Sequence, residues 1–276
     1  MSATTWGCKD LEVRYGPTVA CQDVSFEVAA GTVAAVVGGD GAGKTSLLRA
    51  LAGSVRPAAG TVRRPPQDRL GYVSAGPGVW ADLTVDENLS FAGRAYGLEA
   101  AELGRRIDRL LDRTGLADAR DRLAGRLSGG MRQKLALAMA VAHEPDLLIL
   151  DEPTTGVDPV SRAELWRLLA ASAAGGAAVV LATTYLDEAE RAASVLVLDR
   201  GRALLAGTPD EVLAATPGVV VEGMGRPRGV LSWRRGARWR AWSPDGSVPA
   251  GTSPATLDLE DAVIVAQLGQ EEGRAA

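Results

Sequence analysis

The chain has few of the residues that support several common kinds of site. Its 276 residues include a single histidine, His143, so a histidine cannot act at any other position. The two cysteines, Cys8 and Cys21, lack the spacing and the nearby partners of a metal site. They fit a disulfide or two buried small apolar side chains, and we expect the second, with both thiols reduced in the cytosol.

Long apolar runs are also missing. The longest, such as LALAMAVA at 135–142, fall far short of the roughly 20 residues that cross a bilayer. The opening MSATTWGCKD has no positive segment followed by an apolar one, so no signal peptide is visible. The pattern predicts a soluble chain.

An excess of positive charge is absent as well. The chain has 30 Lys and Arg against 34 Asp and Glu, a net charge of −4. No overall basic field would therefore recruit nucleic acid or an anionic membrane, and any such contact must be local. The apolar fraction of 46% supports either one large core with a small appendage or two modest domains.

Apolar runs punctuated by glycine alternate with helical patterns. The runs at 32–37, 147–150, 178–182 and 194–198 predict strands buried on both faces of a mostly parallel sheet. Near the start, LEVRYG and VSFEV alternate apolar and polar residues, as strands with one solvated face do.

Two segments depart from this alternation. Residues 83–144 are rich in Arg, Glu, Ala and Leu with a 3.6-residue period, which predicts an inserted helical subdomain. After about residue 217 the chain becomes rich in Gly, Pro, Arg and Trp. We therefore expect a main domain at 1–217 and a small accessory region at 218–276.

GGDGAGKT at 38–45 follows a buried strand and precedes a helical stretch, so it matches the P-loop pattern in its required context. Its glycines let backbone N–H groups face a polyphosphate, and the helix N-terminus adds a positive dipole end. Lys44 would neutralise the outer phosphates, Thr45 would hold Mg²⁺, and Asp40 would weaken phosphate binding slightly. The predicted nucleotide-binding residues of this loop are Gly38, Gly39, Asp40, Gly41, Ala42, Gly43, Lys44, Thr45 and Ser46.

Two further motifs point to the same chemistry. LLILDE at 147–152 delivers two acids at the carboxyl end of a buried strand, where open α/β sheets bind ligands. Asp151 suits a Mg²⁺-holding role, and Glu152 would polarise the attacking water. In LSGGMRQK, Ser128 can cap a helix whose first turn, with Gly129 and Gly130, exposes N–H groups to a second phosphate.

In this order and spacing, the P-loop, LSGG, LLILDEPTTGVDP and TTYLDEAE resemble the ATP-binding subunit of ABC transporters, over about residues 8–215. The resemblance implies an α/β fold: a P-loop NTPase (RecA-like) core with a parallel sheet, an antiparallel β subdomain, an inserted α-helical subdomain and a small C-terminal extension. It implies ATP and Mg²⁺ as ligands. It also implies a head-to-tail dimer, in which LSGG closes over ATP held by a second ATP-binding subunit.

The resemblance assigns two more residues. Asp158, in TGVDP, resembles the loop that joins the two sites of the dimer. Tyr15, in VRYG, lies where the family stacks an aromatic ring on adenine, and we expect that role here, although a strand tyrosine usually serves packing or lies at the surface.

The chain departs from the family at two positions. Ala75 occupies the place of a glutamine that touches Mg²⁺ and water, and no glutamine occurs between Asp68 and Arg132. Thr184 occupies the place of a histidine that reaches the γ-phosphate, so Thr184 would act there as a short catalytic substitute. ATP binding should survive, whereas hydrolysis at this site should be slow.

The remaining features suggest partners. GVDPVSRAELW and GTPDEVLAA resemble drug-resistance-type ABC-2 exporters, whose ATPase is a peripheral chain bound to a transmembrane permease at the cytoplasmic face of the membrane. Trp80 would either anchor that partner or lie in the core. The Arg/Trp run at 233–242 would either touch lipid or nucleic acid or form a small packed hairpin with solvated arginines.

Three functions remain open from the residues alone. The first is a motor subunit that couples ATP hydrolysis to export, as a homodimer or heterodimer. The second is a regulatory subunit that binds ATP without hydrolysing it and lends its LSGG to a competent partner. The third is a non-transport ABC protein acting on ribosomes or DNA, which the absence of paired cassettes and long coiled coils disfavours, so no nucleic-acid partner is expected.

Overall fold

A computed structural model describes residues 4–76, 78–226 and 231–275, the last five of these by their backbone only. Its contacts divide the chain into two compact units, Met1–Ala203 and Leu204–Ala276. The composition change predicted a boundary after residue 217. The observed division falls earlier because helix α7 (Pro209–Ala214) packs against α8 (Leu259–Ala275).

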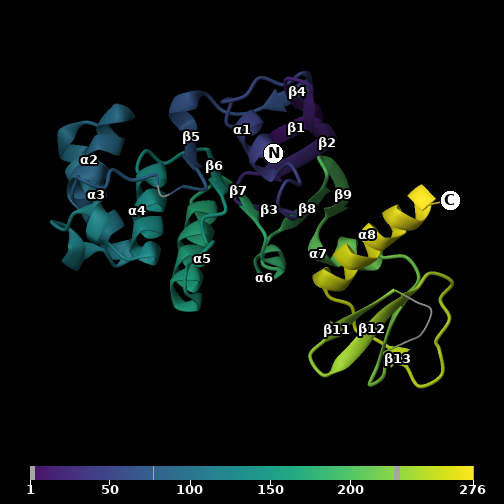
Figure 1. Cartoon of the computed structure of the whole chain (residues 1–276). Helices are drawn as coiled ribbons and strands as arrows, with labels where there is room; N and C mark the ends of the chain where they lie inside the picture. Colours follow the sequence, from purple (N-terminus) through teal and green to yellow (C-terminus); the bar gives the residue numbers. More distant parts are fainter. Residues whose placement is uncertain (1–3, 77, 227–230, 276) are drawn as a thin grey trace. The chain divides into compact units, whose positions relative to one another are not determined.

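The first unit is built on a sheet whose strands are adjacent in the order β5-β6-β7-β3-β8-β9 (Figure 1). The strands β5 to β8 of this order are paired in parallel. β9 straddles the division between the units. In chain order the strands are β3 (Val33–Val37), β5 (Leu70–Val73), β6 (Leu147–Asp151), β7 (Ala178–Thr183), β8 (Ser194–Asp199) and β9 (Arg202–Gly207).

Both faces of this sheet are covered, as the continuous apolar runs predicted. Alternate residues such as Val36 and Ile149 pack with α1 (Lys44–Leu51) and the N-terminal strands. Their neighbours, such as Leu148 and Val179, pack instead with α4 (Gly129–Val141) and α5 (Pro159–Ala174). The four predicted strands are therefore confirmed as the buried centre of the unit.

A second, antiparallel sheet has the order β2-β1-β4. Its strands are β1 (Thr5–Tyr15), β2 (Thr18–Ala29) and β4 (Ala59–Arg63). Cys8 and Cys21 are both buried on this sheet with free thiols, and burial raises the pKa of Cys8 to about 12 and of Cys21 to about 11. The expectation of buried, reduced cysteines is confirmed, and neither thiol is activated as a nucleophile.

The inserted helices have their own core. They are α2 (Val85–Ala95), α3 (Ala100–Thr114) and α4, with short 3₁₀ turns at Gln67–Arg69, Ala117–Ala119 and Ala124–Arg126 elsewhere in the unit. A capping box between Thr84 and Glu87 starts α2, and Gly115 ends α3 in the left-handed region. The inward stripe of these helices, which includes Leu89, Ile107 and Leu135, forms a separate apolar cluster, as expected for an inserted subdomain.

The second unit has a four-stranded antiparallel sheet, in the order β11-β12-β10-β13, and the helices α7 and α8. Its strands are β10 (Val219–Gly223), β11 (Ser232–Arg235), β12 (Arg238–Ser243) and β13 (Ser253–Pro254). Val220, Trp242 and Val265 form its small core. The Arg/Trp run is thus a hairpin, β11–β12, inside this unit.

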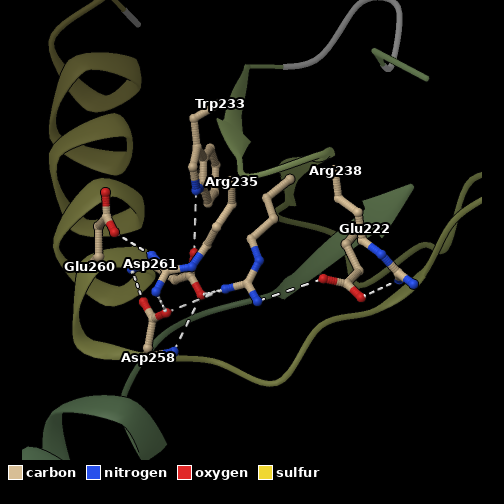
Figure 2. A network of polar contacts seen from close by, with 8 residues as sticks. Glu222, Trp233, Arg235, Arg238, Asp258, Glu260 and Asp261 are labelled. Carbon is tan, nitrogen blue, oxygen red and sulfur yellow. Dashed lines mark hydrogen bonds and ion pairs between the residues drawn. The ribbon is translucent and has the colours of Figure 1, made fainter. Parts of the chain in front are cut away.

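Three arginines of the hairpin are paired with acids, although Arg235 and Arg238 remain exposed, and the exposed Arg234 donates to the carbonyl of Gly236 at 3.1 Å. Arg238 bonds to Glu222 at 2.6 Å, Arg240 pairs with the buried Asp261, and Arg235 pairs with Asp258 at the start of α8 (Figure 2). The unit therefore neutralises three of the four arginines of the run with its own acids, which disfavours the interpretation of the run as a lipid or nucleic-acid surface.

Candidate nucleotide-binding site

The predicted motifs meet at one edge of the parallel sheet. The P-loop follows β3, the acids Asp151 and Glu152 end β6, and Thr184 follows β7, which lies between those two strands. Ala75 follows β5, the strand next to β6, and both Ala75 and Thr184 are exposed. Because parallel strands end at the same edge, the fold collects these residues at the position where open α/β sheets bind ligands.

The P-loop surrounds a buried lysine. The Nζ atom of Lys44, whose side chain is 5% exposed, donates to the carbonyl oxygens of Gly38 at 2.7 Å and Gly39 at 3.2 Å. The loop glycines serve different purposes. Gly41 and Gly43 have φ of 77° and 104°, in the left-handed region that favours glycine. Gly38 is required for space, because a Cβ there would lie 2.4 Å from the carbonyl oxygen of Leu198.

The remaining loop residues differ in exposure. Gly39 and Asp40 are exposed, Ser46 is half-buried, and Ala42 is buried, with its carbonyl accepting from the N–H of Gly201 at 2.9 Å. Ala42 therefore holds the shape of the loop and presents only its backbone to a ligand.

The two acids of β6 occupy different environments. Asp151 is buried and accepts from the Thr45 hydroxyl at 3.2 Å; burial raises its pKa, and that hydrogen bond opposes the rise. Glu152 is half-buried, with Oε1 3.1 Å from Lys44 Nζ and Oε2 accepting from Thr155 at 3.2 Å. Its φ of 51° is a strained conformation for a residue with a side chain.

The LSGG segment begins α4. Ser128 caps the helix by accepting from the N–H of Met131 at 3.2 Å, and Ser128 and Gly129 are exposed. Gly130 is buried, and a Cβ there would lie 2.7 Å from Ser161 Oγ on α5. Among the residues with described side chains, no hydrogen bond or ion pair joins this segment to Lys44 or Glu152.

Asp158 and Tyr15 lie at the surface. Asp158 caps α5 by accepting from the N–H groups of Val160 at 3.1 Å and Ser161 at 3.0 Å, and these bonds lower its pKa. Tyr15 ends β1 with its side chain 42% exposed, so an aromatic face is available to a ligand. The capping role of Asp158 was not part of the sequence prediction, although the Asp-Pro pair at a helix start signals it.

The sequence reasoning missed a buried network beside the site. Glu188, on α6 (Leu186–Ala189), is fully buried and contacts Thr154, Thr183 and Arg162. The run DEAE contains three acids, and nothing in it distinguishes the buried one from the exposed ones.

The side chains present fit a nucleoside triphosphate with Mg²⁺. A hydroxyl and a carboxylate, from Thr45 and Asp151, stand 3.2 Å apart, and oxygen donors of these kinds are the ligands that Mg²⁺ prefers. A buried ammonium group, Lys44, lies in a loop of inward-turned backbone at the start of a helix. Fold and site together define a P-loop nucleotide-binding protein.

Comparison with known proteins makes the class specific. The family model described as ABC transporter matches residues 21–155. The daunorubicin resistance ATP-binding protein DrrA3 of Streptomyces coeruleorubidus is 39% identical over 242 residues, which cover 84% of this chain and 77% of that protein. The Nod factor export ATP-binding protein I of Cupriavidus metallidurans is also 39% identical, over 74% of this chain and 71% of its own length.

Solved structures agree. One described as an ATP binding subunit of an ABC transporter has a TM-score of 0.70 at 32% identity and covers 76% of this chain and 92% of its own. The chain belongs to the ATP-binding subunits of ABC transporters, which are ATPases coupled to transport. Subunits of this family work with transmembrane permeases. Across the described part of the chain, no helix is both long and apolar enough to span a membrane.

Proposed function

We propose that this chain binds Mg-ATP at its own P-loop, hydrolyses it slowly, and drives export through a separate transmembrane permease at the cytoplasmic face of the membrane. One observation carries the proposal: Lys44, Thr45, Asp151 and Glu152 form a connected set at one sheet edge. The names of the relatives, which refer to daunorubicin resistance and Nod factor export, support the direction of transport.

The roles follow from the contacts. Thr45 and Asp151 would hold Mg²⁺, which when bound supplies charge neutralisation for the β- and γ-phosphates. Lys44 would exchange its carbonyl and Glu152 partners for phosphate oxygens. Glu152, released from the ammonium group 3.1 Å away, would then accept a proton from the attacking water. Tyr15, with its exposed ring, would stack on adenine.

Hydrolysis would be slow because one donor to the transition state is missing and another is shortened. Ala75 has no polar side chain, and Thr184 offers a hydroxyl where an imidazole would reach further. Removing one preorganised donor typically costs about 10²–10³ in rate, and two losses in one site need not add. The comparisons give no preference to a subunit that binds ATP without hydrolysing it.

A second ATP-binding subunit would complete the site. Ser128 and Gly129 are exposed at the start of α4, so their N–H groups can face the phosphates of ATP bound to another subunit. Asp158 lies exposed at the start of α5 and would join the two sites. A homodimer would carry two slow sites, whereas a heterodimer would lend this LSGG to a faster one.

The permease would dock on an exposed aromatic pair. Trp80 and Phe91 are 45% and 49% exposed, with ring centroids 4.3 Å apart. Of the two alternatives for Trp80, the core position is therefore wrong. A groove of about 550 Å³ along α2 is lined by Phe91 together with Leu83, Glu87 and Arg94. Exposed aromatics beside a groove are typical anchors of protein interfaces.

Turnover of Mg-ATP by the purified chain tests the proposal. We expect measurable turnover by the wild type, none by Glu152→Gln, and a rise of tenfold or more in the double variant Ala75→Gln with Thr184→His. Binding of the fluorescent analogue TNP-ATP should be similar in all three. A wild type that binds TNP-ATP but turns over only after the double substitution would refute hydrolysis at this site.

A further inference from the structure

Glu188 is a buried acid that the nucleotide-binding residues do not explain. It is fully buried, yet it lies on α6, a single turn of helix just after the segment that carries Thr184. An ionised carboxylate inside a protein needs hydrogen bonds and a charge partner. Glu188 has hydrogen bonds and a charge partner, and these contacts come from three different segments of the chain.

The first contacts are with two threonines. Glu188 Oε2 accepts from Thr183 Oγ1 at 2.6 Å and from Thr154 Oγ1 at 3.0 Å. Thr183 ends β7 and directly precedes Thr184, whereas Thr154 comes two residues after Glu152. One carboxylate oxygen therefore ties together the segments that carry Thr184 and Glu152.

The charge partner comes from α5. Arg162 Nε lies 3.3 Å from Glu188 Oε1, and its Nη2 donates to Asp187 at 3.0 Å. The Arg162 guanidinium also lies over the ring of Tyr185, 4.1 Å from its centroid. We call the contacts of Glu188 with Thr154, Thr183 and Arg162 the Glu188 clamp. Asp158 caps the helix that carries Arg162, so the clamp is also linked to the exposed start of α5.

The turn around Thr184 depends on the same hydroxyl. Thr183 Oγ1 donates to Glu188 and accepts from the N–H of Tyr185 at 3.0 Å, which fixes the backbone on both sides of Thr184. The N–H of Glu152 bonds to the carbonyl of Ala182 at 3.0 Å, one residue before Thr183. The strained Glu152 and the Thr184 turn are thus held against each other.

We propose that Glu188 is a positioning residue for ATP hydrolysis, which locks the Thr184 turn onto the segment that carries Glu152 while Arg162 holds its charge. The inference rests on the proposed function, because it assumes that Glu152 acts on water in this chain. Because the side chain of Thr184 is shorter than that of a histidine, the placement of Thr184 and Glu152 matters more, since small displacements of reacting groups lower the rate by large factors.

The test compares matched variants of the full chain. Glu188→Gln keeps the shape of the side chain and removes the charge that pairs with Arg162. Thr183→Val removes the bridging hydroxyl, and Thr183→Ser restores it. Glu190→Gln makes the same chemical change at an exposed glutamate two residues further on and serves as the control.

We expect Glu188→Gln and Thr183→Val to lower kcat about tenfold or more, with the KM for ATP and the Kd for TNP-ATP within twofold of wild type. Amide hydrogen exchange at 183–186 and 152–156 should become faster in both variants. Thr183→Ser and Glu190→Gln should match wild type. An unchanged unfolding midpoint in Glu188→Gln would separate positioning from general stability.

Three results would overturn the inference. One is a kcat for Glu188→Gln within twofold of an active wild type. Another is a parallel fall of kcat, TNP-ATP affinity and unfolding midpoint, which would mean a purely structural role. If the wild type is itself inactive, the proposed function fails, and hydrogen exchange then tests the clamp by itself. The third result is unchanged exchange at 183–186 in Glu188→Gln, which would refute the clamp.

Discussion

The only histidine of the chain offers a direct test of the packing. His143 is 6% exposed and lies just after α4, stacked on Tyr96 with ring centroids 3.5 Å apart and planes 5° from parallel. Burial, together with the positive charges of Arg69 and Arg106, lowers its pKa from 6.5 to about 4. The folded chain therefore favours the neutral ring, whereas the unfolded chain takes up a proton near pH 6.5.

The sign and size of the effect follow from linkage. The stabilisation is complete above pH 6.5 and is lost progressively as the pH falls toward 4. With about 1.36 kcal/mol for each pKa unit, a shift from 6.5 to about 4 amounts to about 3 kcal/mol. His143→Phe keeps an aromatic ring against Tyr96 and removes the titration, so its stability should fall less over this range.

Urea unfolding of both proteins between pH 7 and pH 4 measures the difference, because the titration of carboxylates is common to the two and cancels. The histidine itself can be followed by NMR, since one histidine gives one ring signal. A folded-state titration midpoint near 6.5, or parallel pH profiles for wild type and His143→Phe, would refute the assignment of His143 as a buried neutral ring.

Three further predictions concern packing and partners. Gly130→Ala should destabilise the chain by about 1–3 kcal/mol in urea unfolding, because its Cβ would lie 2.7 Å from Ser161 Oγ, and Ser161→Gly should restore most of the loss. Asp261→Ala should destabilise the second unit by about 1–3 kcal/mol, detected as faster proteolysis within 204–276, because Arg240 loses its buried partner and keeps only the longer contacts to Glu222 and Asp258, each at 3.6 Å. Trp80→Ala should weaken co-purification with the permease and leave turnover of the isolated chain within twofold; equal co-purification would argue against the docking surface.

The strands and the P-loop could be predicted because their signals are local. A strand buried on both faces must be apolar along its length, and β3, β6, β7 and β8 are apolar apart from polar residues at the ends of the last three. The P-loop pattern fixes the positions of Lys44 and Thr45 relative to a strand and a helix, so their place in the fold follows from the sequence.

Contacts between distant residues carry no such signal. The sequence assigns Gly130 to an anion-binding turn. In the structure, Gly130 also lets α4 pack closely against α5, because a Cβ at this position would collide with Ser161. In the sequence the arginines of β11 and β12 form a basic run, because the acids that pair with them lie elsewhere in the chain: Glu222 precedes the run on β10, and Asp258 and Asp261 follow it at the start of α8 (Figure 2). Only the fold brings those charges together.

The structure shows that the two departures from the family pattern, Ala75 and Thr184, lie outside the packed core. Ala75 and Thr184 lie in exposed segments at the edge of the sheet, where their side chains support no packing. By contrast, Asp151, Thr154, Thr183 and Glu188 are buried and hydrogen-bonded, and their partners Thr45 and Arg162 are half-buried. We therefore expect substitutions of Ala75 and Thr184 to cost little stability while they change the proposed rate of hydrolysis, because neither side chain takes part in the hydrogen bonds and the ion pair that hold Glu152.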